Sequence, residues 1–418
     1  MWATLRKISL TWWIIIGTVT GIMIGWLFPE FGASLKPWSN VFLRMIKSVV
    51  VPIIFGTLVI GIAGHGDDLK RIGRLALKSI SYFWLMTTVA LAIGLIAVNL
   101  TKPGVGVKLA PPDPNAPIPT AAPTTLNGFL EHVVPKSVVE AATNNEVLQI
   151  VFWATLFAIA LTQVKGKPKE AILGFCEGVM ETMFKFVGIV MRYAPIGIGA
   201  AMAVTVSHSG IQVLKNLGLL VGTLYGALIA FVLLALIPAA LIARIPIRAF
   251  IRAVKDPAVI AFTTTSSDAA LPLAMQRMID FGVPKRIVSF VMPTGYSFNL
   301  DGSTLYLGVA SIFVAQAAGV HLSVGQQLFM MLSLMITSKG IAAVPRASLV
   351  VLSGTLVAFG LPLEGVAVIL GVDEFMDMAR TMINLVGNCL ATAIMARWEG
   401  ELKVVEEPEG AQAVSLRP

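Results

Sequence analysis

The chain has 418 residues, of which 56% are hydrophobic and only 13% are charged. Several apolar stretches reach the roughly 20 residues that a helix needs to cross a bilayer, which excludes a soluble globular protein. The formal net charge of +8 would indicate a nucleic-acid partner in a soluble domain. Here the basic residues gather in short connections between apolar stretches, where they orient a membrane protein, so no nucleic-acid partner is expected.

The first half of the chain reads as ordinary membrane-spanning helices. Six spans are predicted, at residues 9–28, 40–63, 79–100, 147–163, 171–206 and 213–243. The first run lacks a cleavage site, so it predicts a spanning helix and not a secretory signal. Connections rich in Lys and Arg alternate with sparse ones, which places the rich connections and both termini in the cytoplasm. We therefore expect a multi-pass protein of the cytoplasmic (inner) membrane, surrounded by lipid.

One long connection and the second half of the chain depart from this pattern. The stretch KLAPPDPNAPIPTAAPTT, within the connection 101–146, is too rich in proline for a helix and predicts an extracellular loop. After Arg252 the apolar runs are broken by small, polar and charged residues. Irregular backbone at membrane depth survives only where protein or a water-filled cavity surrounds it. The breaks therefore indicate a protected polar site.

Two of the breaks resemble one another. Residues 266–272 and 338–345 both end in Ala-Ala-aliphatic-Pro, and each lies between apolar arms too short for two full crossings. This pattern predicts two re-entrant helical hairpins, each followed by a helix interrupted by polar residues. In the first of these helices the stretch Asn299-Leu300-Asp301-Gly302-Ser303 predicts an unwound turn, because glycine relaxes the helix. Corresponding interrupted segments in two halves of a chain indicate a midplane binding site between inverted repeats. The alternative is chance similarity, because the chain contains 37 glycines and many alanines.

The helix after the second hairpin carries the strongest candidate site. Its polar residues recur at spacings of three or four and so share one face of the helix: Asp377, Arg380, Thr381, Asn384 and Asn388. A charge at mid-membrane costs at least about 2.5–3.5 kcal/mol, so Asp377 and Arg380 need a compensating role. They form either an internal ion pair or a clamp for a zwitterion, in which Asp377 takes an ammonium group and the fork of Arg380 takes a carboxylate.

Four motifs in order carry a resemblance over essentially the whole chain. They are Ser266-Ser267-Asp268, Asn299-Leu300-Asp301-Gly302-Ser303, the stretch from Gly340 to Pro345, and Asp377-Met378-Ala379-Arg380-Thr381 with Asn384. The chain resembles the glutamate/aspartate transporter family of acidic amino-acid and C4-dicarboxylate carriers. The resemblance implies an all-α integral membrane protein with eight transmembrane helices and two re-entrant hairpins. It also implies a homotrimer that moves substrate by an elevator-type mechanism.

On this resemblance the chain divides as follows: scaffold helices 1–2 (1–78), transport-domain helix 3 (79–100), the extracellular loop with the start of helix 4 (101–146), scaffold helices 4–5 (147–206), transport-domain helix 6 (213–243), re-entrant hairpin 1 (248–283), helix 7 with an unwound centre (284–318), re-entrant hairpin 2 (323–361), helix 8 (364–397) and a cytoplasmic tail (398–418).

The resemblance also implies a role for each site residue. Asp377 would bind the substrate ammonium and Arg380 the side-chain carboxylate, while Ser303, Thr381 and Asn384 would add hydrogen bonds. The hairpin tips would close over the ligand through Ser266, Ser267, Ala343 and Val344. A dicarboxylate without an amine would leave Asp377 facing another anion. The expected substrate is therefore L-glutamate or L-aspartate, imported by symport, with C4-dicarboxylates as the alternative.

The coupling ion is predicted from departures from sodium-coupled relatives. This chain has Asn388 where they carry a sodium-binding aspartate, and Phe83 and Met86 where they have Tyr and Thr oxygens. An amide binds a hard cation less well than a carboxylate does. A residual cation site remains from Gly295, Asn299, Asp301, Asn384 and Asn388. Proton coupling is favoured, and sodium coupling stays open.

Three charged residues at the hairpin tips are candidates in this coupling. Asp268 is the candidate proton carrier, because burial raises the pKa of a carboxyl group; its alternatives are a helix N-cap or a salt bridge to Arg346. Lys339 is placed to substitute for a mobile cation. No enzyme activity, cofactor or certain metal site is expected. A ligand-gated anion channel is the alternative from a different class, although the chain shows no ligand-binding soluble domain.

Overall fold

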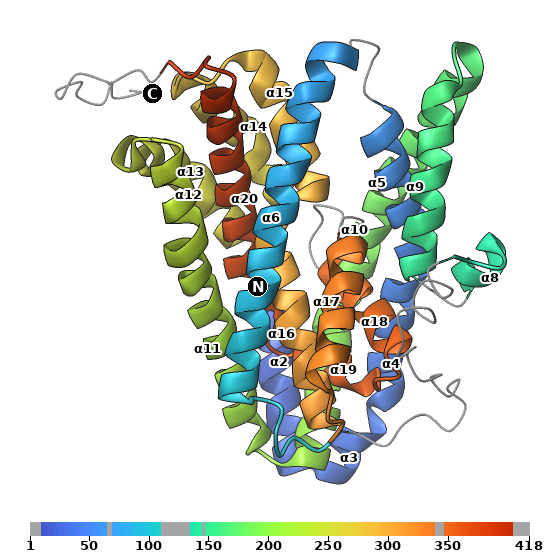
Figure 1. The fold of residues 1–418 in the computed structure, drawn as a ribbon. Helices are drawn as coiled ribbons and strands as arrows, with labels where there is room; N and C mark the ends of the chain where they lie inside the picture. The colour runs from blue at the N-terminus through green and yellow to red at the C-terminus, as the bar shows by residue number, and fades with distance from the viewer. Residues whose placement is uncertain (1–9, 65–68, 110–133, 144–146, 339–346, 404–418) are drawn as a thin grey trace, which may run out of the picture.

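A computed structural model describes residues 10–64, 69–109, 134–143, 147–338 and 347–403 (Figure 1). These residues are predominantly helical and contain no strand, which confirms the expected all-α class. Four predicted site residues lie outside the described residues, namely Lys339, Ala343, Val344 and Arg346. The side chain of Asp268 and most of the proline-rich loop also lie outside them.

Helices occupy all six predicted spans in the first half of the chain. In order they are α2 (Leu10–Leu27), α3 (Pro29–Ser34), α4 (Lys36–Ser48), α5 (Val50–Ala63), α6 (Leu69–Thr101), α8 (Val138–Thr143), α9 (Val147–Gln163), α10 (Lys167–Ser209), α11 (Val213–Phe231), the π-helical turn η1 (Val232–Leu236) and α12 (Ile237–Ile242). The second span consists of α4 and α5, and the sixth consists of α11, η1 and α12.

The second half is built from shorter helices, in agreement with its broken apolar pattern. They are α13 (Ile247–Thr264), α14 (Ser267–Asp280), α15 (Lys285–Phe298), α16 (Asp301–Ala317), α17 (Val324–Thr337), α18 (Ala347–Ala358), α19 (Glu364–Leu370) and α20 (Asp373–Trp398). The helix expected at 364–397 is divided at Gly371 and Val372 into α19 and α20. A Cβ on Gly371 would lie 1.8 Å from the Met202 sulfur, so this junction packs tightly against α10.

Among the residues that the structure describes, four helical stretches are long and apolar enough to cross a bilayer by themselves: Arg74–Thr101, Lys167–His208, Val213–Ile242 and Lys285–Ala317. The pair α13 and α14 differs from these. Its helices have 18 and 14 residues, or about 27 and 21 Å at 1.5 Å per residue. The two helices pack against each other and are joined by a turn at Thr265 and Ser266, so they form a helical hairpin.

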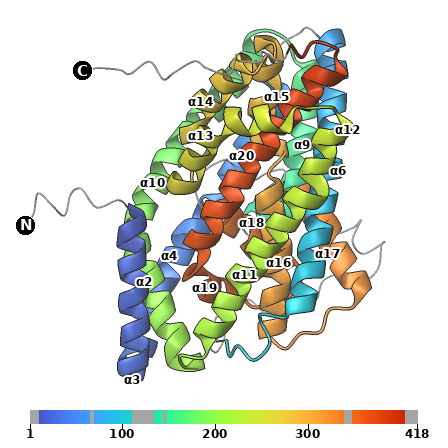
Figure 2. The same cartoon turned by 90° about the vertical axis from the view of Figure 1, so that its left-hand side faces the viewer.

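The helices pack as two groups (Figures 1 and 2). In one group α2, α3, α4 and α5 contact the long α10, and α9 contacts α5. In the other group α13, α14, α15 and α16 contact α20, while α6 and α11 pack against α16. Every residue of α16 from Asp301 to Ala315 is buried. A helix that is covered on all sides can hold polar groups away from lipid and water.

Glycines set the spacing between α2 and α10. Gly17, Gly21 and Gly25 recur every four residues and so share one face of α2. A Cβ on Gly21 would lie 2.0 Å from the carbonyl oxygen of Gly199. Small residues let two helix backbones approach closely enough for continuous van der Waals contact. The first group of helices depends on this contact.

Gly21→Ala is expected to lower the free energy of unfolding by about 1–3 kcal/mol, because the added methyl group pushes α2 away from α10. Unfolding in detergent, followed by circular dichroism, measures the change. Gly218→Ala on α11 is the matched control, since nothing lies within 4 Å of its added Cβ. The control should unfold like the parent or slightly later, because alanine has the higher helix propensity. Equal stability of the two variants would contradict the close α2–α10 contact.

Candidate functional site

The helix break between α15 and α16 is the first feature of the site. Asn299 and Leu300 leave the helical conformation, with φ/ψ of −129°/61° and −100°/63°. The predicted unwound turn from Asn299 to Ser303 is therefore too long, because Asp301, Gly302 and Ser303 form the first turn of α16. Gly302 does not loosen the helix. A Cβ at this position would lie 2.4 Å from the carbonyl oxygen of Arg380, so Gly302 permits α16 to touch α20.

Two reciprocal hydrogen bonds join α16 to α20 beside this contact. The Asn384 amide nitrogen donates to Ser303 Oγ at 2.9 Å, and the Ser303 backbone N–H donates to Asn384 Oδ1 at 3.1 Å. Both residues are buried. Each hydrogen bond satisfies a group that would otherwise be buried without a partner. Ser303 and Asn384, which the resemblance assigns to the substrate, here bond to each other, and their bonds hold the two helices in register.

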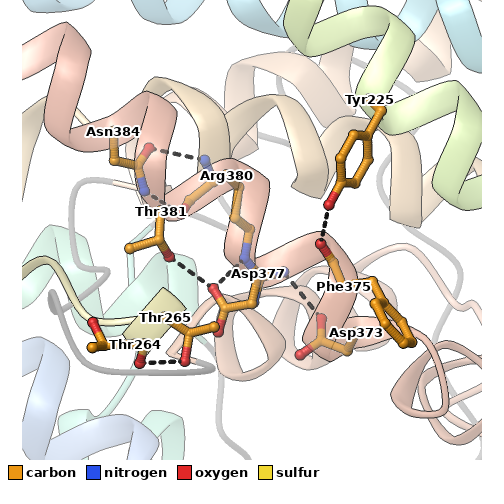
Figure 3. Close-up of polar contacts among 10 residues, drawn as sticks. Tyr225, Thr264, Thr265, Asp373, Phe375, Asp377, Arg380, Thr381 and Asn384 are labelled. Carbon is orange, nitrogen blue, oxygen red and sulfur yellow. Dashed lines mark hydrogen bonds and ion pairs between the residues drawn. The ribbon is translucent and has the colours of Figure 1, made fainter. Parts of the chain in front are cut away.

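Arg380 lies at the centre of a charged network on α20 (Figure 3). Its Nε donates to Asp377 Oδ1 at 2.8 Å, and its Nη1 donates to Asp373 Oδ1 at 3.0 Å. Thr381 Oγ1 donates to the same Asp377 oxygen at 3.0 Å. The Arg380 side chain is 0% exposed. The internal ion pair, one of the two predicted roles, is therefore present, and a second carboxylate shares the guanidinium.

Asp373 and Tyr306 are members of this network that the sequence reasoning missed. The guanidinium carbon of Arg380 lies 4.1 Å from the centre of the Tyr306 ring, an arrangement that gives a cation–π attraction. Asp373 and Asp377 are four residues apart on the face that bears Arg380, so their spacing could have revealed the second carboxylate. Likewise Tyr306 follows Ser303 by three residues, which places both on one face of α16.

The network keeps unused hydrogen-bonding capacity. Arg380 Nη2 and Asp373 Oδ2 are buried and have no hydrogen-bond partner among the described residues. A buried polar group without a partner costs about 1–3 kcal/mol. A guanidinium presents five N–H donors in a planar fork that matches a carboxylate. The arrangement can therefore accept an anionic ligand group that bonds to the remaining nitrogen.

A cluster of amide and carboxylate side chains lies at the helix break between α15 and α16. Asn299 Nδ2 donates to Asn388 Oδ1 at 3.3 Å. With its amide turned over, Asn299 would donate to the two Asp301 carboxylate oxygens at 3.3 and 3.2 Å. Gly295 lies directly against Asn388, because a Cβ there would lie 2.0 Å from Asn388 Oδ1. Four of the five residues predicted for a residual cation site therefore meet, while Asn384 bonds to Ser303 instead.

This cluster offers oxygen ligands but only one carboxylate. No group of three or more His, Cys, Asp or Glu side chains gathers as a metal site in the part of the chain that the structure describes. Oxygen atoms of carboxylates and amides suit hard cations, and their affinity rises with the number of charged ligands. Asn388 leaves the cluster with Asp301 as its carboxylate. Phe83 and Met86 of α6 are buried in the core and add no oxygen.

The tip of the first hairpin lies beside α20. Ser266 caps α14 by accepting a hydrogen bond from the Ala269 backbone N–H at 3.4 Å. The Ser267 carbonyl accepts a bond from the Tyr296 hydroxyl at 3.2 Å, which ties the tip to α15. The alternative role of Asp268 as the N-cap is therefore wrong, because Ser266 holds that position. Both arms of the hairpin, α13 and α14, contact α20, the helix that carries the charged network.

The start of α20 is fixed from the opposite side. The Tyr225 hydroxyl of α11 donates to the Phe375 carbonyl at 2.8 Å (Figure 3). This bond ties α11 to the first turn of α20, the turn that begins with Asp373. The helices α11, α13, α14, α15 and α16 all contact α20.

Comparison with known proteins identifies the family. The model of the sodium:dicarboxylate symporter family matches residues 10–398. The chain belongs to this family. It is an integral membrane symporter and not an enzyme, in agreement with its apolar helices. The resemblance drawn from the four motifs is thereby confirmed.

Three relatives show the range of named substrates. The chain is 42% identical to a proton/sodium-glutamate symport protein of Geobacillus stearothermophilus over 98% of this chain and 99% of the relative. It is 42% identical to the proton/glutamate-aspartate symporter of Escherichia coli, over 94% and 93%. A C4-dicarboxylate transport protein of Rhizobium leguminosarum is 40% identical, over 94% and 89%.

Asp373→Ala is expected to lower the free energy of unfolding by about 3–5 kcal/mol, since it leaves the Arg380 guanidinium with one of its two buried carboxylates. Denaturant unfolding in detergent measures the loss. Asp256→Ala is the matched control, because its pair with Arg277 is 45% and 44% exposed and such pairs contribute about 0–1 kcal/mol. A loss for Asp373→Ala no larger than the control's would show that the network does not stabilise the fold.

Proposed function

We propose that this protein is a secondary active symporter that imports acidic amino acids, L-glutamate and/or L-aspartate. The observation that carries the proposal is the buried Arg380 fork beside Asp377. Together they present one cation and one anion within a few ångströms on the same helix face. An acidic amino acid has the complementary set, a side-chain carboxylate and an ammonium group. The names of the relatives that act on glutamate and aspartate support the same substrates.

The internal ion pair and the ligand clamp are two states of the same residues. Without substrate, Arg380 and Asp377 neutralise each other at 2.8 Å, which makes two buried charges tolerable. In the substrate complex the guanidinium turns its fork to the side-chain carboxylate, while Asp377 takes the ammonium. Thr381 moves together with Asp377, to which its hydroxyl is hydrogen-bonded. Ser266 and Ser267 at the first hairpin tip, with Ala343 and Val344 at the second, are proposed to close over the α-carboxylate.

C4-dicarboxylates are the second candidate substrates. The named activity of the Rhizobium relative, at 40% identity, favours them. Such a ligand carries two carboxylates and no ammonium, so it would bring a second anion toward Asp377 without a compensating cation. Desolvating an unpaired carboxylate is costly. The charge pattern on α20 therefore supports amino acids over dicarboxylates.

Charge balance supports coupling to a cation. Counted as ionised, Asp373, Asp377 and Arg380 sum to one negative charge in a buried network. An acidic amino acid adds one further negative charge. A net charge of two in a low-dielectric interior is strongly unfavourable, and a proton or sodium ion bound with the substrate relieves it. Import of the anion and entry of a cation are thus one event.

The coupling ion is proposed to be a proton, with sodium as the alternative. The amide of Asn388 and the apolar side chains of Phe83 and Met86 weaken the oxygen cluster for a hard cation. Asp268 at the first hairpin tip is the proposed proton carrier, and Lys339 and Arg346 are further candidates for a role in coupling. Asn299 and Asp301 keep the sodium alternative open, as does the proton/sodium name of one relative.

The proposed architecture follows the family resemblance. It comprises eight spanning helices and two re-entrant hairpins in inverted repeats, assembled as a homotrimer in the cytoplasmic membrane with both termini in the cytoplasm. The second group of helices, around α16 and α20, would move substrate across as an elevator. The short arms of α13 and α14 support the first hairpin, since neither spans about 30 Å. A ligand-gated anion channel would instead conduct without net uptake.

Asp377→Asn is expected to reduce glutamate and aspartate uptake at least about tenfold while reducing succinate uptake less, because the lost charge pairs only with an ammonium. Uptake in proteoliposomes, with both substrate classes tested on the same preparation, measures the split. Arg380→Ala is the positive control and should abolish binding of both classes. Equal losses for succinate and glutamate in Asp377→Asn would rule out the ammonium role.

Separately imposed gradients test the coupling ion. With a pH gradient, acidic outside, and no sodium, proteoliposomes should accumulate glutamate or aspartate. With a sodium gradient at equal pH they should accumulate little, since the cluster at Asn299, Asp301 and Asn388 has lost charged ligands. Accumulation driven by sodium alone would establish the alternative. Current without uptake would support a channel.

A further inference from the structure

The chain that leaves α20 contacts several other elements of the second helix group. We name residues 397–403 the C-terminal clasp. Arg397 Nη2 donates to the carbonyl of Arg244, between α12 and α13, at 3.1 Å. The Lys403 backbone N–H donates to the carbonyl of Gly282, between α14 and α15, at 3.0 Å. The end of α20 is therefore tied to two turns that are distant in sequence.

Local structure turns the clasp back onto the helix bundle. Gly400 adopts a left-handed conformation with φ of 74°, and the Glu401 backbone N–H donates to the Ala396 carbonyl at 2.9 Å. This is the pattern by which glycine ends a helix and reverses the chain. The reversal sets Glu399 and Glu401 on the two sides of Gly400. Each then meets a different helix.

Glu399 is the centre of the clasp. Its carboxylate accepts a hydrogen bond from Lys78 Nζ at 2.6 Å and a second from Arg74, both on α6. Lys78 also donates to the Trp398 carbonyl at 3.3 Å. The Glu399 side chain is 10% exposed, and its bonds to Lys78 and Arg74 hold the pKa of the carboxyl below its ordinary value. An isolated exposed ion pair adds little, but a sheltered carboxylate shared by two cations is a network.

Two further contacts extend the network. Glu401 pairs with Arg286 in the first turn of α15. The Trp398 ring packs edge-on against Tyr82 of α6, with ring centres 6.2 Å apart. The clasp therefore joins the C-terminal end of α20 to the N-terminal parts of α6 and α15. Two of these helices also position site residues, because Asn299 directly follows α15 and Asn384 lies on α20.

We propose that Glu399 is a positioning residue for substrate binding, which holds α20 in axial register against α6 and α15 so that Arg380 and Asn384 stay opposite the start of α16. The inference rests on the proposed function, because it assigns Arg380 to the substrate. The physical link is the continuity of α20 from Asp373 to Trp398. A continuous helix transmits an axial shift along its length, and a displacement of about 1 Å at a site is enough to weaken it.

Charge reversal tests the proposal in the full-length protein. In proteoliposomes, Glu399→Lys is expected to raise the KM for glutamate or aspartate about tenfold, and Glu399→Gln about threefold, with smaller changes in maximal rate. Lys78→Glu alone should raise KM as well. The double variant Glu399→Lys with Lys78→Glu should return KM to within about threefold of the parent, because it restores an opposite-charge pair.

One control variant and a comparison of stability with KM separate positioning from general stability. Glu170→Gln, on the exposed start of α10, should leave KM unchanged. A clasp with only a structural role would lower the melting temperature and the yield of folded protein but leave KM at the parent value. Folded Glu399→Lys with the parent's KM would therefore overturn the proposal. If that variant does not fold, the same criterion applies to Glu399→Gln.

Hydrogen exchange keeps the test independent of the proposed function. If the parent protein takes up no acidic amino acid, the proposed function fails, and the clasp is then judged by amide exchange in peptides that cover residues 373–384. Faster exchange there in Glu399→Gln than in the parent and in Glu170→Gln would support the positioning role. Unchanged exchange would overturn it.

Discussion

The structure depends on one buried guanidinium. Arg380 is completely enclosed, and it is held by Asp377, Asp373 and the face of Tyr306. A charge so far from water is tolerable only with partners of this kind. Those partners come from two helices, so α20 and α16 cannot separate without exposing Arg380 to an apolar surrounding. The position of the site and the packing of the second helix group thus follow from the same charge.

Glycines at the helix contacts allow the backbones to approach closely enough to enclose the charged network. Gly302 brings the backbone of α16 against the carbonyl of Arg380, and Gly295 brings α15 against Asn388. Ser303 and Asn384 then close two hydrogen bonds across the contact. Because α16 is covered on every side from Asp301 to Ala315, the bonds between Ser303 and Asn384 are enclosed away from lipid and bulk water. The site is a set of polar contacts between α16 and α20, enclosed within the packed helices.

Sequence reasoning located the helices and most of the polar residues between them. Period-3.6 patterning places Asp377, Arg380 and Asn384 on one face whatever the tertiary structure, so the polar face was predictable. Asp373 was missed because an acidic residue in the first turn of a helix ordinarily needs no further explanation than the helix dipole. The contact of Tyr306 with Arg380 lies between helices, and spacing within one helix does not show which partner a neighbouring helix supplies.

The unwound turn shows the same limit. A glycine after Asn299-Leu300-Asp301 suggested loosened backbone up to Ser303, but Gly302 is helical and its smallness serves an interhelix contact. Composition reports that a position must be small, and the tertiary structure decides why. Ser266 illustrates the reverse case, because its preference for helix N-caps is local. The sequence reasoning offered that role only as one alternative for Asp268, although a local rule was sufficient to assign it to Ser266.

The two-residue break at Asn299 and Leu300 sets two helix ends of opposite polarity next to each other. The carbonyl end of α15 carries a partial negative charge and the amide end of α16 a partial positive charge, each of about half an elementary charge. A cation is stabilised on one side of the break and an anion on the other, within two residues of backbone. An ion and a substrate that occupy these neighbouring fields also attract each other. The proposed coupling of substrate to a cation would then require no long-range signal, because two opposite charges held this close attract each other directly.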